Sequence, residues 1–271
     1  MIRRGAPTGV APLQGLGENT LTMARESHFN TQLFKFLRQL KRHNNREWFQ
    51  SHKADYQQSV RDPFLRFIAD FQPRLFEISP QLIADPKPTG GSLLRIYKDL
   101  RFRPDAPPYQ TRAAARFPHK AWKQTHAPGL YLHLEPGKSF LGGGLWHPDP
   151  ETRARVREAI VANPQQWRKA TGSKRFKTVW SLGGESLQRL PPGLDADHLF
   201  ATDLKRKDFI SGTNFSEEQV CAPDFMGQVV SACKAAAPFM EFLTRALGLP
   251  WASGDKSSVR DLSSTDSFQL A

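Results

Sequence analysis

The chain has 271 residues, of which 39% are hydrophobic, and a formal net charge of +12 at neutral pH. Nineteen phenylalanines and six tryptophans exclude a largely disordered chain and predict an aromatic core. No apolar run reaches the roughly 18 residues of a transmembrane helix, and the N-terminus lacks the apolar core of a secretory signal. We therefore expect a cytoplasmic protein without a membrane partner, whose positive charge favours anionic partners.

The sequence predicts one α+β domain over residues 26–250, with disordered tails over residues 1–25 and 251–271. Met23 is a candidate for the native start of the chain. The two cysteines, Cys221 and Cys233, form neither a disulfide framework nor a zinc-binding pattern, so both are expected to be reduced.

Helical spacing of apolar residues marks the N-terminal quarter of the domain. A first helix is predicted over residues 29–40, with Asn30 or Thr31 as its N-cap. A second helix is expected to begin near Arg46 and to run to Phe71, with a kink or break at Pro63.

The segment from Leu94 to Arg103 alternates in polarity and predicts the central strand of a sheet. One face carries Leu94, Ile96, Leu100 and Phe102, and the other carries Arg95, Tyr97, Asp99, Arg101 and Arg103. A carboxylate between arginines stays ionised and holds its neighbours, and the remaining guanidiniums suit phosphate or carboxylate. The alternative is an ordinary solvated strand face, on which exposed ion pairs contribute little.

Basic residues continue beyond this segment. From Arg95 to Lys123 there are eight basic residues and two acidic ones, a net charge of +6 that is half of the whole chain's +12. Such a region favours a small anionic ligand, for example a phosphorylated one, or the phosphates of nucleic acid. Residues 111–123 are predicted to be either irregular or a further strand.

The same segment resembles the signature R-x-x-R-D-x-R-F-x-x-x-K-x-x-Y of a family of conserved hypothetical proteins from bacteria and fungi, catalogued as domain of unknown function 2461. The matching residues are Arg95, Asp99, Arg101, Phe102 and Tyr109. Lys98 stands where the signature has arginine, and Ala106 stands where it has lysine. The resemblance extends from about Phe29 to Leu249 and includes N-N-R-E-W-F at Asn44–Phe49. It implies the location of a site and no reaction.

Residues 130–146 read as a β-hairpin around the turn Pro136–Lys138. Tyr131, His133 and Glu135 share the face away from the core. If this hairpin joined the central strand in one sheet, they would lie beside Arg95, Asp99 and Arg101. His133 and Glu135 would then be candidates for acid–base catalysis. The alternative is a polar layer whose hydrogen bonds are all satisfied. The glycines at 142–144 predict a bulge or the close approach of a ligand or of another backbone.

The C-terminal part is predicted to be mostly helical. Asp149–Glu151 has the residues of a helix N-terminus, and a short helix follows over residues 165–170. Residues 174–187 are expected to form a short hairpin, and residues 223–247 the last long helix, kinked at Pro238.

These patterns predict an α+β fold with a central, mostly antiparallel sheet flanked by N-terminal and C-terminal helices. The favoured function is binding of a small anionic ligand. The binding candidates are Arg95, Lys98, Asp99, Arg101 and Tyr109. Two alternatives remain open: an architectural signature in a protein-interaction domain, and a nucleic-acid-binding module. No nucleophile motif, metal cluster or cofactor fingerprint is present, so the sequence predicts no cofactor and names no reaction. Enzymatic activity and oligomeric state stay open.

Overall fold

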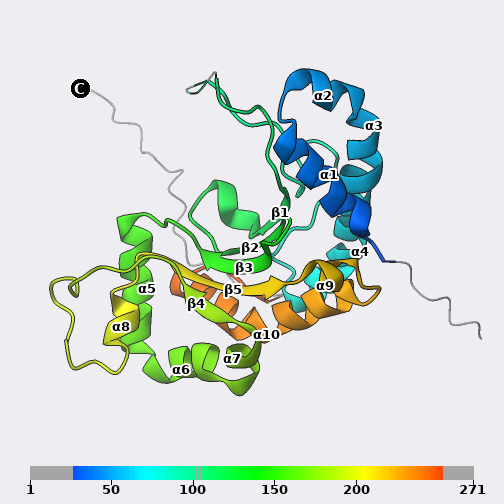
Figure 1. The fold of residues 1–271 in the computed structure, drawn as a ribbon. Helices are drawn as coiled ribbons and strands as arrows, with labels where there is room; N and C mark the ends of the chain where they lie inside the picture. The colour runs from blue at the N-terminus through cyan, green and yellow to red at the C-terminus, as the bar shows by residue number, and fades with distance from the viewer. Residues whose placement is uncertain (1–26, 102, 104, 253–271) are drawn as a thin grey trace, which may run out of the picture.

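The computed structural model describes residues 27–101, 103 and 105–252. It has the predicted α+β fold, a five-stranded antiparallel sheet with helices before and after it (Figure 1). Phe102, Met23, the predicted tail at 1–25 and all but the first two residues of the predicted tail at 251–271 lie outside the described residues. No helix in the described part of the chain combines the length and the apolar character needed to cross a membrane.

The strands are β1 (Ala113–Pro118), β2 (Gly129–Leu134), β3 (Ser139–Leu145), β4 (Ser181–Gly183) and β5 (Phe209–Phe215). Their order is β1-β2-β3-β5-β4, and every neighbouring pair is antiparallel. β2 and β3 are the predicted hairpin. Residues 111–123, expected to be either irregular or a strand, contain the strand β1. The register places His133 between Ala114 of β1 and Phe140 of β3.

The helices before the sheet are α1 (Thr31–Arg42), α2 (Arg46–Ser51), α3 (Lys53–Tyr56), the π-helical turn η1 (Gln57–Arg61) and α4 (Asp62–Ile78). Asn30 caps α1 as predicted, because its Oδ1 accepts the Gln32 N–H at 2.9 Å. The single helix expected from Arg46 to Phe71 is wrong, since the chain breaks into shorter elements. Pro63 lies in the first turn of α4, directly after η1, and does not end the helical run.

The other helices are the 3₁₀ turn η2 (Lys120–Lys123), α5 (Pro150–Ala162), α6 (Pro164–Gly172), α7 (Lys174–Val179), α8 (Ala201–Leu204), α9 (Glu217–Cys221) and α10 (Phe225–Ala246). Asp149 caps α5 by accepting the Thr152 N–H at 2.7 Å. α10 contacts β3, α4, α5, α6 and α7, and Figure 1 shows it running along the sheet. It therefore joins the two groups of helices into one core.

The two faces of the sheet differ in burial. Leu130, Leu132 and Leu134 are buried on the α10 side, as predicted. The opposite face, here called the open face, carries side chains that are partly or fully exposed. Its residues include Arg116, Tyr131, Phe140, Gly142, Gly212 and Asn214. His133 lies on the same face and is buried.

The expected central strand at 94–103 is wrong as a regular strand. Isolated bridges join Leu93 to Ala115 and Tyr97 to Tyr109. A constant register would place Tyr97 opposite Thr111, so the ladder slips between the two bridges, and Pro107 and Pro108 have no N–H to continue it. The predicted alternation nevertheless holds in part. Arg95, Tyr97 and Asp99 are exposed, and Ile96 is buried.

Two further expectations are wrong. Residues 174–187 do not form a hairpin, because α7 begins on the Ser173 cap and β4 then pairs with β5. Trp251, placed in the C-terminal tail, is buried, and its carbonyl accepts a hydrogen bond from Ser79 Oγ at 2.6 Å. The packed part of the chain thus extends at least to Trp251.

We predict that Gly144→Ala destabilises the fold. Gly144 has φ +122°, and an added Cβ would lie 2.1 Å from the Phe209 carbonyl oxygen across the β3–β5 pair. The clash involves backbone on both sides, so the loss of unfolding free energy should exceed about 2 kcal/mol in a urea titration. Gly183→Ala is the control, since its Cβ would meet no atom within 4 Å. If Gly144→Ala lowers the unfolding free energy as little as Gly183→Ala does, the close approach of Gly144 to the Phe209 carbonyl is contradicted.

Candidate functional site

Asp99 lies between two arginines, as the sequence predicted. Its Oδ2 is 2.6 Å from Arg101 Nη2 and 3.9 Å from Arg95 Nη2. The hydrogen bonds of the Arg101 side chain and backbone N–H, with a smaller effect of Arg95, lower the pKa of Asp99 below its usual value. All three side chains are exposed, so these pairs shape the segment more than they stabilise it.

Tyr109, at the end of the signature, is buried and tied to the N-terminal helices. The side-chain amide of Asn44 donates to the Tyr109 carbonyl at 3.0 Å, and its oxygen accepts the Tyr109 N–H at 2.9 Å. One side chain therefore satisfies both backbone groups of Tyr109, as a neighbouring strand would. This contact joins the motif at 44–49 to the signature segment.

Aromatic rings continue this junction. The ring of Phe49, in α2, stacks on Tyr109 with centroids 4.1 Å apart. Tyr97 lies 5.2 Å from Tyr109 and 5.8 Å from Phe49, and Tyr56 lies 5.4 Å from Phe49. Three phenols from separate parts of the sequence thus meet around one phenylalanine.

Two arginines act on these phenols. The charge of Arg61 favours ionisation of Tyr56 and that of Arg46 favours ionisation of Tyr109, but burial is the larger effect on both. It raises the pKa of Tyr56 to about 12 and raises that of Tyr109 as well. We call Tyr56, Tyr97, Tyr109, Arg46 and Arg61 the tyrosine–arginine cluster.

Within the described residues, no hydrogen bond is made by the hydroxyl of Tyr56, Tyr97 or Tyr109. None of these hydroxyls is a fully buried atom without a partner, since among the described side chains that atom is Ser211 Oγ. The three hydroxyls therefore reach solvent, although the Tyr109 side chain is only 1% exposed as a whole. The raised pKa values of Tyr56 and Tyr109 keep these two phenols protonated at neutral pH, so they are available as hydrogen-bond donors.

His133 and Glu135 belong to a second group of polar side chains. His133 Nε2 lies 3.0 Å from Glu135 Oε2, and His133 Nδ1 lies 3.2 Å from the hydroxyl of Tyr131. Burial lowers the pKa of His133 below 6.5, while the hydrogen bond and charge of Glu135 oppose that shift. Arg112 and Lys138 lower it further through their charges.

The structure therefore sorts the predicted residues into separate groups. Arg95, Asp99 and Arg101 pair with one another, Tyr109 joins the tyrosine–arginine cluster, and Lys98 is half-buried with its N–H bonded to the Pro108 carbonyl at 2.8 Å. The regular strand that would have placed His133 and Glu135 beside these arginines is absent. Tyr56 and Arg61 were missed, because helical spacing assigned Tyr56 to the core and gives no sign of a π-helical turn.

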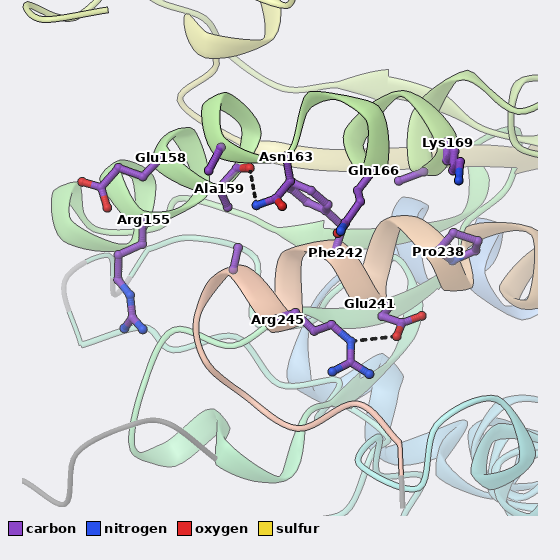
Figure 2. Close-up of a pocket in the computed structure, with 13 residues that line it drawn as sticks. Arg155, Glu158, Ala159, Asn163, Gln166, Lys169, Pro238, Glu241, Phe242 and Arg245 are labelled. Carbon is purple, nitrogen blue, oxygen red and sulfur yellow. Dashed lines mark hydrogen bonds and ion pairs between the residues drawn. The ribbon is translucent and has the colours of Figure 1, made fainter. Parts of the chain in front are cut away.

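A groove of about 710 Å³ lies between α5, α6 and α10 (Figure 2). The two arginines that line it form hydrogen bonds with other groups of the protein. Arg245 Nε bonds to Glu241 Oε1 at 2.8 Å, and Arg155 Nη2 donates to the Leu247 carbonyl at 2.8 Å. None of the predicted site residues lines it. In the described part of the chain, no three His, Cys, Asp or Glu side chains gather as a metal site.

Both motifs lie within one match to a known family. The model of the family described as conserved hypothetical protein (DUF2461) matches residues 32–242, which include Asn44, Phe49 and the whole signature. The chain belongs to this family. The family's description names no activity, and no curated protein matches the sequence significantly.

We expect Asn44→Ala to loosen the junction. The substitution leaves the Tyr109 N–H and carbonyl without their side-chain partner, so the unfolding free energy should fall by about 1–3 kcal/mol. Gln50→Ala, at an exposed position of the nearby helix α2, should change it by less than about 0.5 kcal/mol. Chemical denaturation measures both variants, and equal losses would show that Asn44 has no special role.

The pKa of His133 should respond in opposite directions to its two charged neighbours. Glu135→Gln removes the charge that raises it, so the pKa should fall further below 6.5. Arg112→Gln removes a charge that lowers it, so the pKa should move back up. An NMR titration of the imidazole signals measures both, with Arg168→Gln, an exposed arginine on α6, as control. Shifts of the same sign in both variants would contradict this arrangement.

Proposed function

We propose that the protein binds a small anionic ligand, carrying a phosphate or carboxylate group, at the tyrosine–arginine cluster. The observation that carries the proposal is the hydroxyl of Tyr109, which reaches solvent from an otherwise buried side chain and has no hydrogen-bond partner among the described residues. Two more phenols without partners and two arginines accompany it. A ligand with several acceptor oxygens would satisfy these donors together.

The chemistry of the donors favours an anion over a neutral ligand. Protonated phenols donate hydrogen bonds, and guanidinium groups add charge and paired N–H donors that match phosphate and carboxylate. Glu47 is the acidic residue next to Arg46, and it is exposed on α2. Arg61 already bonds to Asp62, with its Nε 2.8 Å from Oδ1, so its remaining N–H groups are the ones available.

The backbone near Tyr56 supports a functional role for this place. The π-helical turn η1 begins directly after Tyr56 and ends at Arg61. Such turns are rare and occur frequently at functional sites, because they shift side chains relative to a regular helix. Here the turn follows Tyr56 and contains Arg61, so it sets the relative position of two of the three cluster members that come from the N-terminal helices.

Arg95 and Arg101 extend the positive charge beyond the cluster on an exposed segment. In this proposal they attract the ligand, and the phenols hold it. A nucleic-acid partner would instead draw its affinity mainly from the exposed basic residues between Arg95 and Lys123, and that affinity would fall steeply with salt.

We predict that inorganic phosphate, pyrophosphate or a small dicarboxylate raises the melting temperature of the full chain. A ligand at about 100 times its Kd adds about 2.7 kcal/mol of stability. Tyr97→Phe, which removes one hydroxyl, and Arg46→Gln should each reduce the shift at a fixed ligand concentration. A thermal-shift titration at constant ionic strength measures the effect.

Arg168→Gln is the matched control, because it removes the same charge from an exposed position on α6. It should keep the wild-type response. The proposal is rejected if none of these anions changes the melting temperature. It is also rejected if Arg46→Gln and Arg168→Gln reduce the shift equally, because net charge alone would then explain the binding.

A further inference from the structure

Three titratable side chains follow one another on the open face of β2 and its end. The hydroxyl of Tyr131 lies 3.2 Å from His133 Nδ1, and His133 Nε2 lies 3.0 Å from Glu135 Oε2. Thr111 Oγ1 donates to the other oxygen of Glu135 at 3.3 Å. A carboxylate, an imidazole and a hydroxyl are thus connected in line.

The donors and acceptors of this line are consistent with one direction of proton transfer. Both oxygens of the Glu135 carboxylate accept hydrogen bonds, so His133 carries its proton on Nε2. Burial favours the neutral imidazole, whose Nδ1 is then a lone-pair acceptor facing the Tyr131 hydroxyl. His133 is therefore positioned as a base toward Tyr131.

The surroundings hold the base and leave the phenol accessible. His133 is 6% exposed and stacks on Phe140 with centroids 4.7 Å apart and planes 17° apart. Tyr131 is half-buried. Its cross-strand neighbour on β3 is Gly142, which has no side chain, and its neighbour on β1 is Arg116. The guanidinium of Arg116 lies 4.2 Å from the ring centroid of Trp122.

We infer that Glu135, His133 and Tyr131 form a catalytic relay in which Tyr131 is the nucleophile toward an acyl group. A nucleophile within hydrogen-bond reach of a base, which a third group orients, is the common arrangement of covalent catalysis. Glu135 is a positioning residue in this relay. Arg116, the cross-strand neighbour of Tyr131 on β1, adds positive charge to the same face, which suits an acyl compound that carries a negative charge.

The chemical step balances within these residues and the substrate. The Tyr131 oxygen attacks the acyl carbonyl, and its proton passes to His133 Nδ1. The leaving group departs with that proton, and Tyr131 becomes an aryl ester. Water then attacks the ester while His133 accepts one of its protons, and Tyr131 regains its hydroxyl as the acid is released. This site uses different residues from the tyrosine–arginine cluster, so its test stands apart from that of the proposed anion binding.

The four tyrosines of the chain allow one internally controlled experiment. The full chain is treated with N-acetylimidazole at pH 7.5, and acetylation of Tyr56, Tyr97, Tyr109 and Tyr131 is followed by peptide mass spectrometry. Exposure alone predicts that Tyr97, at 45%, reacts first. General-base assistance of about 10²-fold predicts instead that Tyr131 reacts at least about tenfold faster than Tyr97.

Two variants separate the relay from exposure. His133→Gln should bring the Tyr131 rate below that of Tyr97, and Glu135→Gln should lower it by about tenfold or more, with Tyr97 unchanged in both. Continued protection of the buried Tyr109 reports that the variants are folded. If Tyr109 becomes reactive in His133→Gln, that variant is unfolded, and the pH series on the wild type described below tests the relay instead.

In the wild type, the ratio of Tyr131 to Tyr97 acetylation should fall as acid protonates His133. The groups that face this imidazole are Tyr131, Glu135, Arg112 and Lys138, and Glu135→Gln should move the midpoint of the fall to lower pH. If the hydrogen-bond chain were only structural, the ratio of Tyr131 to Tyr97 acetylation would not follow the protonation of His133. If Tyr97 reacts faster than Tyr131 and their ratio does not change with pH, the relay is overturned.

Discussion

The attachment of Tyr109 to the N-terminal helices is the contact on which the arrangement of the signature segment depends. Asn44 replaces the partner strand that Tyr109 lacks, and Phe49 covers its ring. Without these contacts, the slipped ladder between residues 93–98 and 108–115 would have little to hold it, because isolated bridges provide few hydrogen bonds. The N-terminal motif therefore supports the signature segment rather than forming a separate helix.

The overall fold was predictable because strong periodic patterns controlled it. The β2–β3 hairpin, the caps at Asn30 and Asp149 and the long C-terminal helix all follow from local signals in the sequence. The central strand at 94–103 was predicted wrongly, since alternation of polarity does not distinguish a paired strand from an extended segment whose register slips. Prolines at 107 and 108 were visible signs of that interruption.

The candidate site was only partly predictable for a related reason. The sequence placed Arg95, Asp99 and Arg101 together, because alternate residues of an extended chain share a side. It also placed Tyr131, His133 and Glu135 together on β2. It did not bring Tyr56 to Tyr97, because that contact depends on how α2 and η1 pack against the signature segment. Contacts between distant segments need the tertiary structure.

The π-helical turn has an evolutionary consequence. A π turn differs from an α turn by one extra residue, so deletion of a single residue from Gln57–Arg61 would convert it to regular helix without breaking the chain's path into α4. Because the wider turn already absorbs the extra residue, the deletion would leave Tyr56 on nearly the same side of the helix relative to α4. The turn is therefore a place where one residue can be lost or gained while the helices on either side keep their packing.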